Sequence, residues 1–126
     1  MAIDDLWGKL SDVEEIKTPL VILKEQAELL TEKTDGLLVG RVSQKLSGER
    51  FLCFFNIVVP TLNDYNYRLL ALSYGIEVYP LNLTAANKPL VECSDEDEFK
   101  KELGKILKSQ ETQNVISKLL MHVRSA

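Results

Sequence analysis

Phe51-Leu52-Cys53-Phe54-Phe55-Asn56-Ile57-Val58-Val59 is an apolar run without a charged residue near the middle of this 126-residue chain, and the predicted fold is built around it. A strand with one solvent-exposed face alternates apolar and polar side chains. This stretch does not alternate, because apolar side chains occupy both sets of alternate positions. One set is Phe51, Cys53, Phe55, Ile57 and Val59, and the other contains Leu52, Phe54 and Val58. The pattern predicts a strand that is covered on both faces.

A hairpin is predicted around this strand. Ser47-Gly48 is a turn signal that separates residues 37–46 from residues 49–59, and both runs have strand character. Pro60 ends the second run, because proline has no N–H to donate to a strand ladder.

The segment after the hairpin has two interpretations. Residues 65–74 fit either a strand or a helix that is capped by Asn63 or Asp64 and stopped by Gly75. The tyrosines in this part of the chain favour the strand, because aromatic residues are enriched in strands. Further strands are predicted over residues 76–83 and 89–93, with a polar turn between them.

The N-terminal part of the chain predicts a helix over residues 19–33. Thr18 can cap its free N–H groups, Pro19 suits its first position, and Gly36 is a stop signal after its end. A shorter amphipathic piece is predicted at residues 3–10, with Leu6, Trp7 and Leu10 on one side, followed by a capping box at residues 11–14.

Two more helices are predicted at the C-terminal end. The first begins in the acidic residues 94–98, since acids favour the positive end of a helix dipole, and Gly104 within it indicates close packing against the sheet. Ser109 or Thr112 caps the last helix. Its apolar side chains follow helical spacing and form one broad face: Val115, Ile116, Leu119, Leu120 and Val123.

The fold class that follows is a single α+β domain over residues 1–126. It consists of an N-terminal helix, an antiparallel meander sheet of four to five strands, and two C-terminal helices packed on the sheet. Helices at the chain ends can cover one sheet face fully. The other face is then covered in part by a partner or by a second copy in a homodimer; alternatively, the N-terminal helix covers one face and the C-terminal pair the other.

Charge and composition exclude several classes of protein. The net charge is −4, and acids outnumber bases most strongly in residues 1–36. The bases Arg41, Lys45, Arg50 and Arg68 are scattered along the middle of the sequence, so no nucleic-acid footprint is predicted. No apolar run reaches the length of a membrane span, and the N-terminus lacks a basic secretion signal. We therefore expect a cytoplasmic protein with no membrane partner, in which Cys53 and Cys93 are reduced core residues.

Catalytic and metal-binding motifs are absent from the sequence. The single histidine, His122, and two distant cysteines cannot form a zinc site, and no glycine-rich phosphate loop is present, so neither a metal nor a cofactor is predicted. The acidic run at 92–98 lacks the spacing of a calcium loop. One remote enzyme hypothesis is a metal-dependent nuclease, which requires Glu49, Asp64 and Glu77 to converge on Mg²⁺.

Tyrosines supply the candidate binding residues. All four tyrosines lie within fifteen residues of one another, and tyrosine and arginine are enriched in protein interfaces. The predicted partner-binding set is Tyr65, Tyr67, Arg68, Tyr74 and Tyr79. The alternative is that these are ordinary strand residues, packed on helices with their hydroxyls at the rim.

The function predicted from these features is a non-enzymatic protein-interaction module. Small acidic proteins of the chaperone, immunity and regulatory adaptor types share its size and charge, and an acidic N-terminal part favours a basic partner. A second hypothesis is a small apolar-ligand binder with a pocket between sheet and helices, lined by Phe54, Leu70, Tyr74 and Tyr79.

Overall fold

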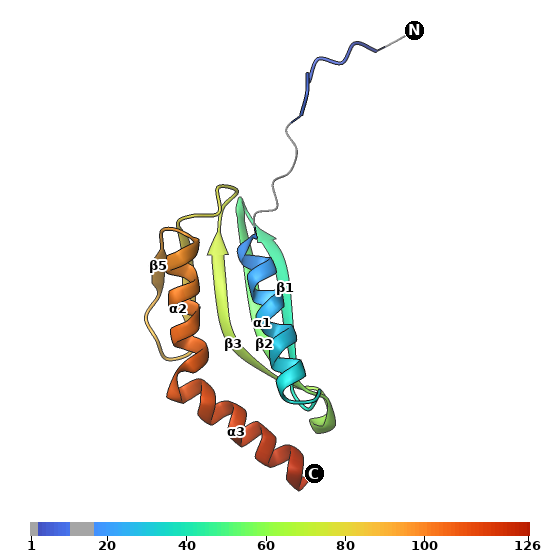
Figure 1. Cartoon of the computed structure of the whole chain (residues 1–126), viewed down its shortest axis with the longest axis vertical. Coiled ribbons are helices and arrows are strands. Elements are labelled where there is room, and N and C mark those ends of the chain that lie inside the picture. Colours follow the sequence, from blue (N-terminus) through green and yellow to red (C-terminus); the bar gives the residue numbers. More distant parts are fainter. Residues whose placement is uncertain (1–2, 11–16) are drawn as a thin grey trace.

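The fold is α+β, as the sequence predicts, and it consists of a five-stranded antiparallel sheet flanked in sequence by helices (Figure 1). A computed structural model describes residues 3–10 and 17–126. Helix α1 precedes the sheet, a short 3-10 turn η1 (Pro60–Leu62) follows the second strand, and helices α2 and α3 end the chain. The helices span Pro19–Lys33 (α1), Glu96–Lys108 (α2) and Gln110–Ser125 (α3). The strands lie in sequence order and span Val39–Ser47 (β1), Arg50–Val59 (β2), Tyr65–Tyr74 (β3), Leu81–Ala85 (β4) and Val91–Cys93 (β5).

Side-chain caps begin all three helices. The N–H of Val21 donates to Thr18 Oγ1 at 3.3 Å, and the N–H of Glu98 donates to Asp95 Oδ1 at 2.8 Å. Ser109 rather than Thr112 caps α3, because Ser109 Oγ accepts from the Thr112 N–H at 3.3 Å. Each cap satisfies an N–H that has no partner within its helix, which fixes where the helix begins.

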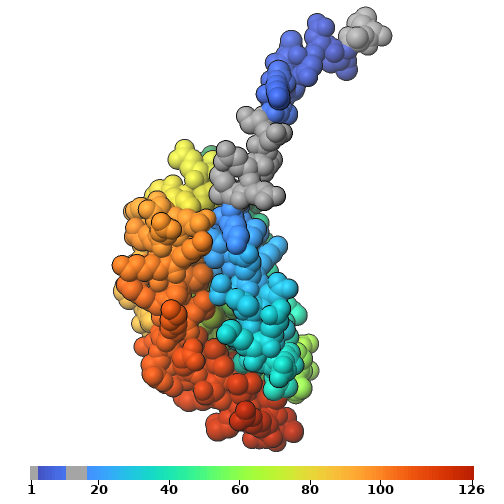
Figure 2. Space-filling model, viewed as in Figure 1, coloured from blue at the N-terminus to red at the C-terminus, as the bar shows by residue number. Residues whose placement is uncertain are grey.

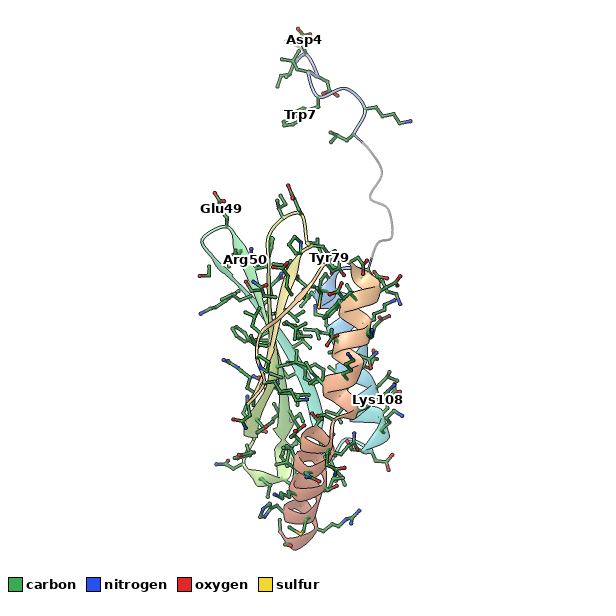
Figure 3. The ribbon with its side chains drawn as sticks, turned by 90° about the vertical axis from the view of Figure 1, so that its left-hand side faces the viewer. Asp4, Trp7, Glu49, Arg50, Tyr79 and Lys108 are labelled. Carbon is green, nitrogen blue, oxygen red and sulfur yellow. The ribbon has the colours of Figure 1, made fainter. Side chains whose placement is uncertain are left out.

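Helix cover lies on one face of the sheet only. On β2, Cys53, Phe55, Ile57 and Val59 form the buried core with side chains from α1, α2 and α3. Figure 3 shows the sheet edge-on, with the helices on the same side of it. Within the described residues no helix covers the other face, which carries Leu52 and Phe54 half-buried and Val58 buried by its neighbours. The alternative in which the N-terminal helix covers one face and the C-terminal pair the other is therefore wrong. We call the uncovered side the open face.

Helix α1 lies directly on the edge strand β1 at Gly40. A Cβ added at Gly40 would stand 2.5 Å from the carbonyl oxygen of Ala27, so only glycine permits this approach. The contact is reinforced by a hydrogen bond, because the Gly40 N–H donates to Thr31 Oγ1 at 3.0 Å. In contrast, a Cβ at Gly104 would meet no atom within 4 Å, so the predicted close packing of Gly104 on the sheet is wrong.

The strand predicted over residues 76–83 is wrong in its first half. Residues 75–80 form a tight turn, in which the Val78 N–H donates to Gly75 O and the Tyr79 N–H donates to Glu77 O, each at 2.9 Å. Val78 has φ +74°, a conformation that a β-branched residue rarely adopts. The turn satisfies its backbone groups locally, so strand β4 begins only at Leu81. The strand interpretation of residues 65–74 is confirmed as β3.

The segment of residues 3–10 forms no helix, contrary to the sequence-based expectation. Its side chains Ile3, Leu6, Trp7 and Leu10 are exposed, and Figure 1 shows it extending away from the sheet and helices. A helix this short is unstable without a surface to pack on. We call residues 3–10 the N-terminal segment. The predicted capping box at residues 11–14 lies outside the described residues.

In the described part of the chain, none of the helices combines the length and apolar character needed to cross a membrane.

Candidate functional site

An apolar groove runs between the helices over the middle of the sheet. Figure 1 shows α1 and α2 side by side, with β2 and β3 between them, and Figure 2 shows the hollow between the two helices. The groove has a volume of about 600 Å³, and its floor is formed by Phe55, Ile57 and Leu69. Its apolar walls come from α1 on one side and from α2 and α3 on the other: Leu29, Leu30, Leu107, Ile116 and Leu120. We call this feature the interhelical groove.

The groove exists because the helices pack on opposite edges of the sheet. Helix α1 is held over the edge strand β1 by the Gly40 contact, and α2 packs beside β5 at the other edge. The central strands therefore lie between two helices rather than beneath one. The wall side chains are left partly in solvent, and Leu29 keeps 42% of its surface exposed. Lys33 and Lys108 add positive charge at the rim.

The threonine hydroxyls that line the groove are already hydrogen-bonded to backbone carbonyl oxygens. The Thr112 hydroxyl donates to the Ile106 carbonyl oxygen at 2.7 Å, and the Thr34 hydroxyl donates to the Leu30 carbonyl oxygen at 3.0 Å. The remaining polar lining residues, such as Gln26 and Gln113, belong to the helices that form the walls. The groove can therefore bury apolar side chains, but it offers few free polar groups to orient a ligand.

Two of the predicted tyrosines lie together at a second hollow, between β3 and α3. Tyr65 is 51% exposed and Tyr67 is half-buried, and both line a cavity of about 440 Å³ with Lys118 and His122. The aromatic rings stand on the helix-covered face of β3. Sequence spacing alone could not place His122 beside them, because α3 follows β3 by more than thirty residues.

The structure separates the other three members of the predicted set. Tyr74 lies at the far end of β3 with 4% of its surface exposed; it is hydrogen-bonded to Cys53 Sγ at 3.5 Å, and burial raises its pKa. Arg68 points to the open face, where its guanidinium lies 4.1 Å from the centre of the Phe54 ring. Tyr79 belongs to the turn before β4. The five residues do not form one continuous surface, and their role in partner binding stays a prediction.

Tyr79 has an unusual environment. Its hydroxyl is buried and has no hydrogen-bond partner among the described residues. Burial, with smaller contributions from the negative charges of Glu96, Cys93 and Asp95, raises the pKa of Tyr79 to about 12. Figure 3 shows Tyr79 at the same end of the sheet as Glu49 and Arg50.

The four bases that are scattered in the sequence share the open face. Arg41, Asn56 and Arg68 are register partners across β1, β2 and β3, so the two arginines flank the asparagine in one row. Lys45 lies four residues after Arg41 on the same face of β1, and Arg50 Nε on β2 donates to Ser73 Oγ on β3 at 2.8 Å. Glu92 is the one acid at the strand positions of this face. Because side chains alternate between the two faces of a strand, the sequence alone predicts that Arg41 and Lys45 share a face. Placing Arg68 beside them requires the register of the strands.

The remaining sequence hypotheses on chemistry do not match the geometry. Glu49 and Glu77 lie at one end of β3 and Asp64 lies at the other, about 30 Å away along ten strand residues, so the three nuclease carboxylates do not converge. Among residues 3–10 and 17–126, no three His, Cys, Asp or Glu side chains are placed to hold a metal ion.

The predicted lining of a ligand pocket is also wrong. Phe54 belongs to the open face, while Leu70 and Tyr74 are core residues, and none of these borders the interhelical groove. Tyr79 lies at the β3–β4 turn, and it does not border the groove either.

Comparison of the chain with family models, with curated proteins and with solved structures finds no match in any of the three.

Proposed function

We propose that the protein is a cytoplasmic, non-enzymatic protein-interaction module of the chaperone, immunity or regulatory adaptor type, and that its binding site is the interhelical groove. The observation that supports this proposal is the set of apolar walls that the chain's own helices leave uncovered above Phe55 and Ile57. Burying one leucine side chain of the walls is worth about 1.5–3 kcal/mol, so a few such contacts supply useful affinity.

An amphipathic helix of a partner is the segment that suits this groove. Helix α1 forms one wall and helices α2 and α3 form the other, so a partner helix laid between the walls would fill the gap in the helical layer over the sheet. Helix-in-groove recognition uses apolar anchors one helical turn apart, which the row of wall side chains can receive. Lys33 and Lys108 at the rim favour acidic residues on the partner's outer face.

A small apolar ligand is the second candidate for the same groove. Its volume of about 600 Å³ falls within the range of about 300–1,000 Å³ that is typical of small-molecule sites. Such sites orient their ligands by a few free polar groups. Because the hydroxyls of Thr112 and Thr34 are already hydrogen-bonded to backbone carbonyls, the groove favours a polypeptide over an oriented small molecule.

Leu29→Arg tests the groove, and Val21→Arg is its matched control. Both residues lie on α1 and are similarly exposed, at 42% and 40%, but only Leu29 borders the groove. We expect a polypeptide to co-purify with the native full-length protein from its source, identified by mass spectrometry. Calorimetry should show that Leu29→Arg weakens the binding of this polypeptide at least tenfold. The affinity of Val21→Arg for the polypeptide should stay within about twofold of the wild-type affinity.

Two outcomes would contradict the proposal. Binding of the polypeptide that is equally strong in Leu29→Arg and in the control places its site elsewhere. A bound apolar small molecule that is lost only in Leu29→Arg establishes the second candidate instead.

A further inference from the structure

The charges of the molecule are segregated between the two sides of the sheet. The strand positions of the open face carry four bases and the single acid Glu92, which leaves a charge of +3. Because the whole chain carries −4, the rest of the chain carries −7. A charged surface of one sign attracts segments of the opposite sign over distances of about one Debye length, which is roughly 8 Å at physiological salt.

The open face also presents an apolar strip between its bases. Leu52 and Phe54 are half-buried at the centre of this face, with Lys45 opposite Leu52 and Ser43 opposite Phe54 on the neighbouring strand. Arg68 lies against the Phe54 ring as a cation–π pair. The surface therefore suits a segment that combines acidic and large apolar side chains.

The chain's own N-terminal segment has this composition. Asp4 and Asp5 are followed at once by Leu6 and Trp7, and residues 1–17 contain five acids against two lysines. Trp7 is 81% exposed, and its apolar neighbours in the segment are exposed as well. Figure 3 shows Asp4 and Trp7 far from the sheet, so the segment carries apolar surface that its own domain does not cover.

We propose that the N-terminal segment of one copy docks on the open face of a second copy, and that the reciprocal contact forms a two-fold dimer. The segment leads into α1, which lies on the helix-covered side of the sheet, so its own open face is on the far side. A two-fold axis brings each segment to the other copy's open face and buries both apolar strips. This contact uses a surface separate from the interhelical groove, so Leu29→Arg leaves it unchanged.

Trp7 provides the readout, because it is the only tryptophan in the chain. As the concentration of the full-length protein rises, light scattering should show the mass doubling from the 14.3 kDa of one chain. Over the same range, the Trp7 emission should shift to shorter wavelength as the ring leaves water. Added salt should shift both signals toward the monomer, since the contact is between exposed charges.

Charge exchange identifies the two surfaces. Asp4→Lys with Asp5→Lys, or Arg41→Glu with Arg68→Glu, should each abolish the dimer. An equimolar mixture of the two variants should restore it, because each reversed segment then meets a complementary face. Lys24→Glu with Lys101→Glu is the matched control; both lysines are exposed on helices, and this variant should still dimerise.

Four results would overturn the proposal. In the first, light scattering gives the mass of one chain, and Trp7 emission stays that of an exposed ring, at every concentration. In the second, the Trp7 emission is shifted to shorter wavelength to the same extent at every concentration. In the third, the dimer persists in both charge-reversal variants. The fourth is a monomer that binds a labelled single-stranded oligonucleotide and loses this binding in Arg41→Glu with Arg68→Glu, which would make the open face a phosphate-binding site.

Discussion

Gly40 determines how closely α1 can approach the sheet. The residue stands on the helix-covered face of β1, and its Cα faces the backbone of Ala27. Any side chain at this position would push the helix away from the strand. Because this contact fixes α1 over the sheet edge, it also fixes one wall of the interhelical groove.

Gly40→Ala should destabilise the protein by about 1–3 kcal/mol, since its methyl group would overlap the Ala27 carbonyl oxygen 2.5 Å away. Urea unfolding measures the change. Gly104→Ala is the control, because its methyl meets no atom within 4 Å and alanine is the better helix former, by about 1 kcal/mol. Unchanged stability in Gly40→Ala would show that α1 does not lie on β1 at this point.

Gly40 and Val78 mark a limit of prediction from sequence. A glycine at position 40 signals a permissive backbone, but the close approach of Ala27 depends on a contact between two elements. Val78 shows the same limit, because a β-branched residue favours a strand and carries no signal for its positive φ. The structure places both residues where tertiary contacts override local preference.

At the scale of elements, the junction between β5 and α2 gathers negative charge around buried groups. Asp95 caps α2, and Glu96, Asp97 and Glu98 form its first turn. Burial, together with the negative charges of Glu98, Glu102 and Asp95, raises the pKa of the Cys93 thiol to about 11. The folded state therefore favours the neutral thiol.

Stability should fall at alkaline pH because of this junction. The ordinary pKa of a cysteine here is 9.0, and the folded value is about 11, so the unfolded thiol ionises first. The contribution of Cys93 is fully present below pH 9 and is lost as pH rises through 11. Urea midpoints measured from pH 8 to 11 should fall less steeply in Cys93→Ala than in the wild type; equal slopes would contradict this role of Cys93.

Elements were predictable where their signals are local. Thr18 and Ser109 cap helices through hydrogen bonds to residues three positions away, and Ser47-Gly48 marks a hairpin between adjacent strands. Neither the groove nor the basic open face is local in this sense. Bringing Arg41 and Arg68 into one row depends on the register of three strands and on the irregularity between Phe55 and Asn56. That register follows from side-chain packing over the whole sheet, which sequence spacing does not reveal.

On the scale of the whole molecule, one-sided helix cover explains both candidate surfaces. All the described helices lie on the same face of the sheet: α1 and α2 pack over its opposite edges and α3 runs across one end of it, which leaves a groove between them. The opposite face keeps apolar residues on β2 and collects the bases of β1 and β3. The sequence predicts that both faces of strand β2 are apolar. It does not predict which of the two faces the helices cover.

The central claim is that the helices cover only one face of the sheet. We test it by measuring the thiol reactivity of Ser43→Cys in a solution dilute enough for the protein to be monomeric. Ser43 is exposed on the open face opposite Phe54, whereas the native thiols of Cys53 and Cys93 are buried beneath the helices. We predict that the new thiol reacts at nearly the rate of a free cysteine, while Cys53 and Cys93 react only after unfolding. A Ser43→Cys thiol as unreactive as Cys53 would show that the chain itself covers this face, and would contradict the open sheet.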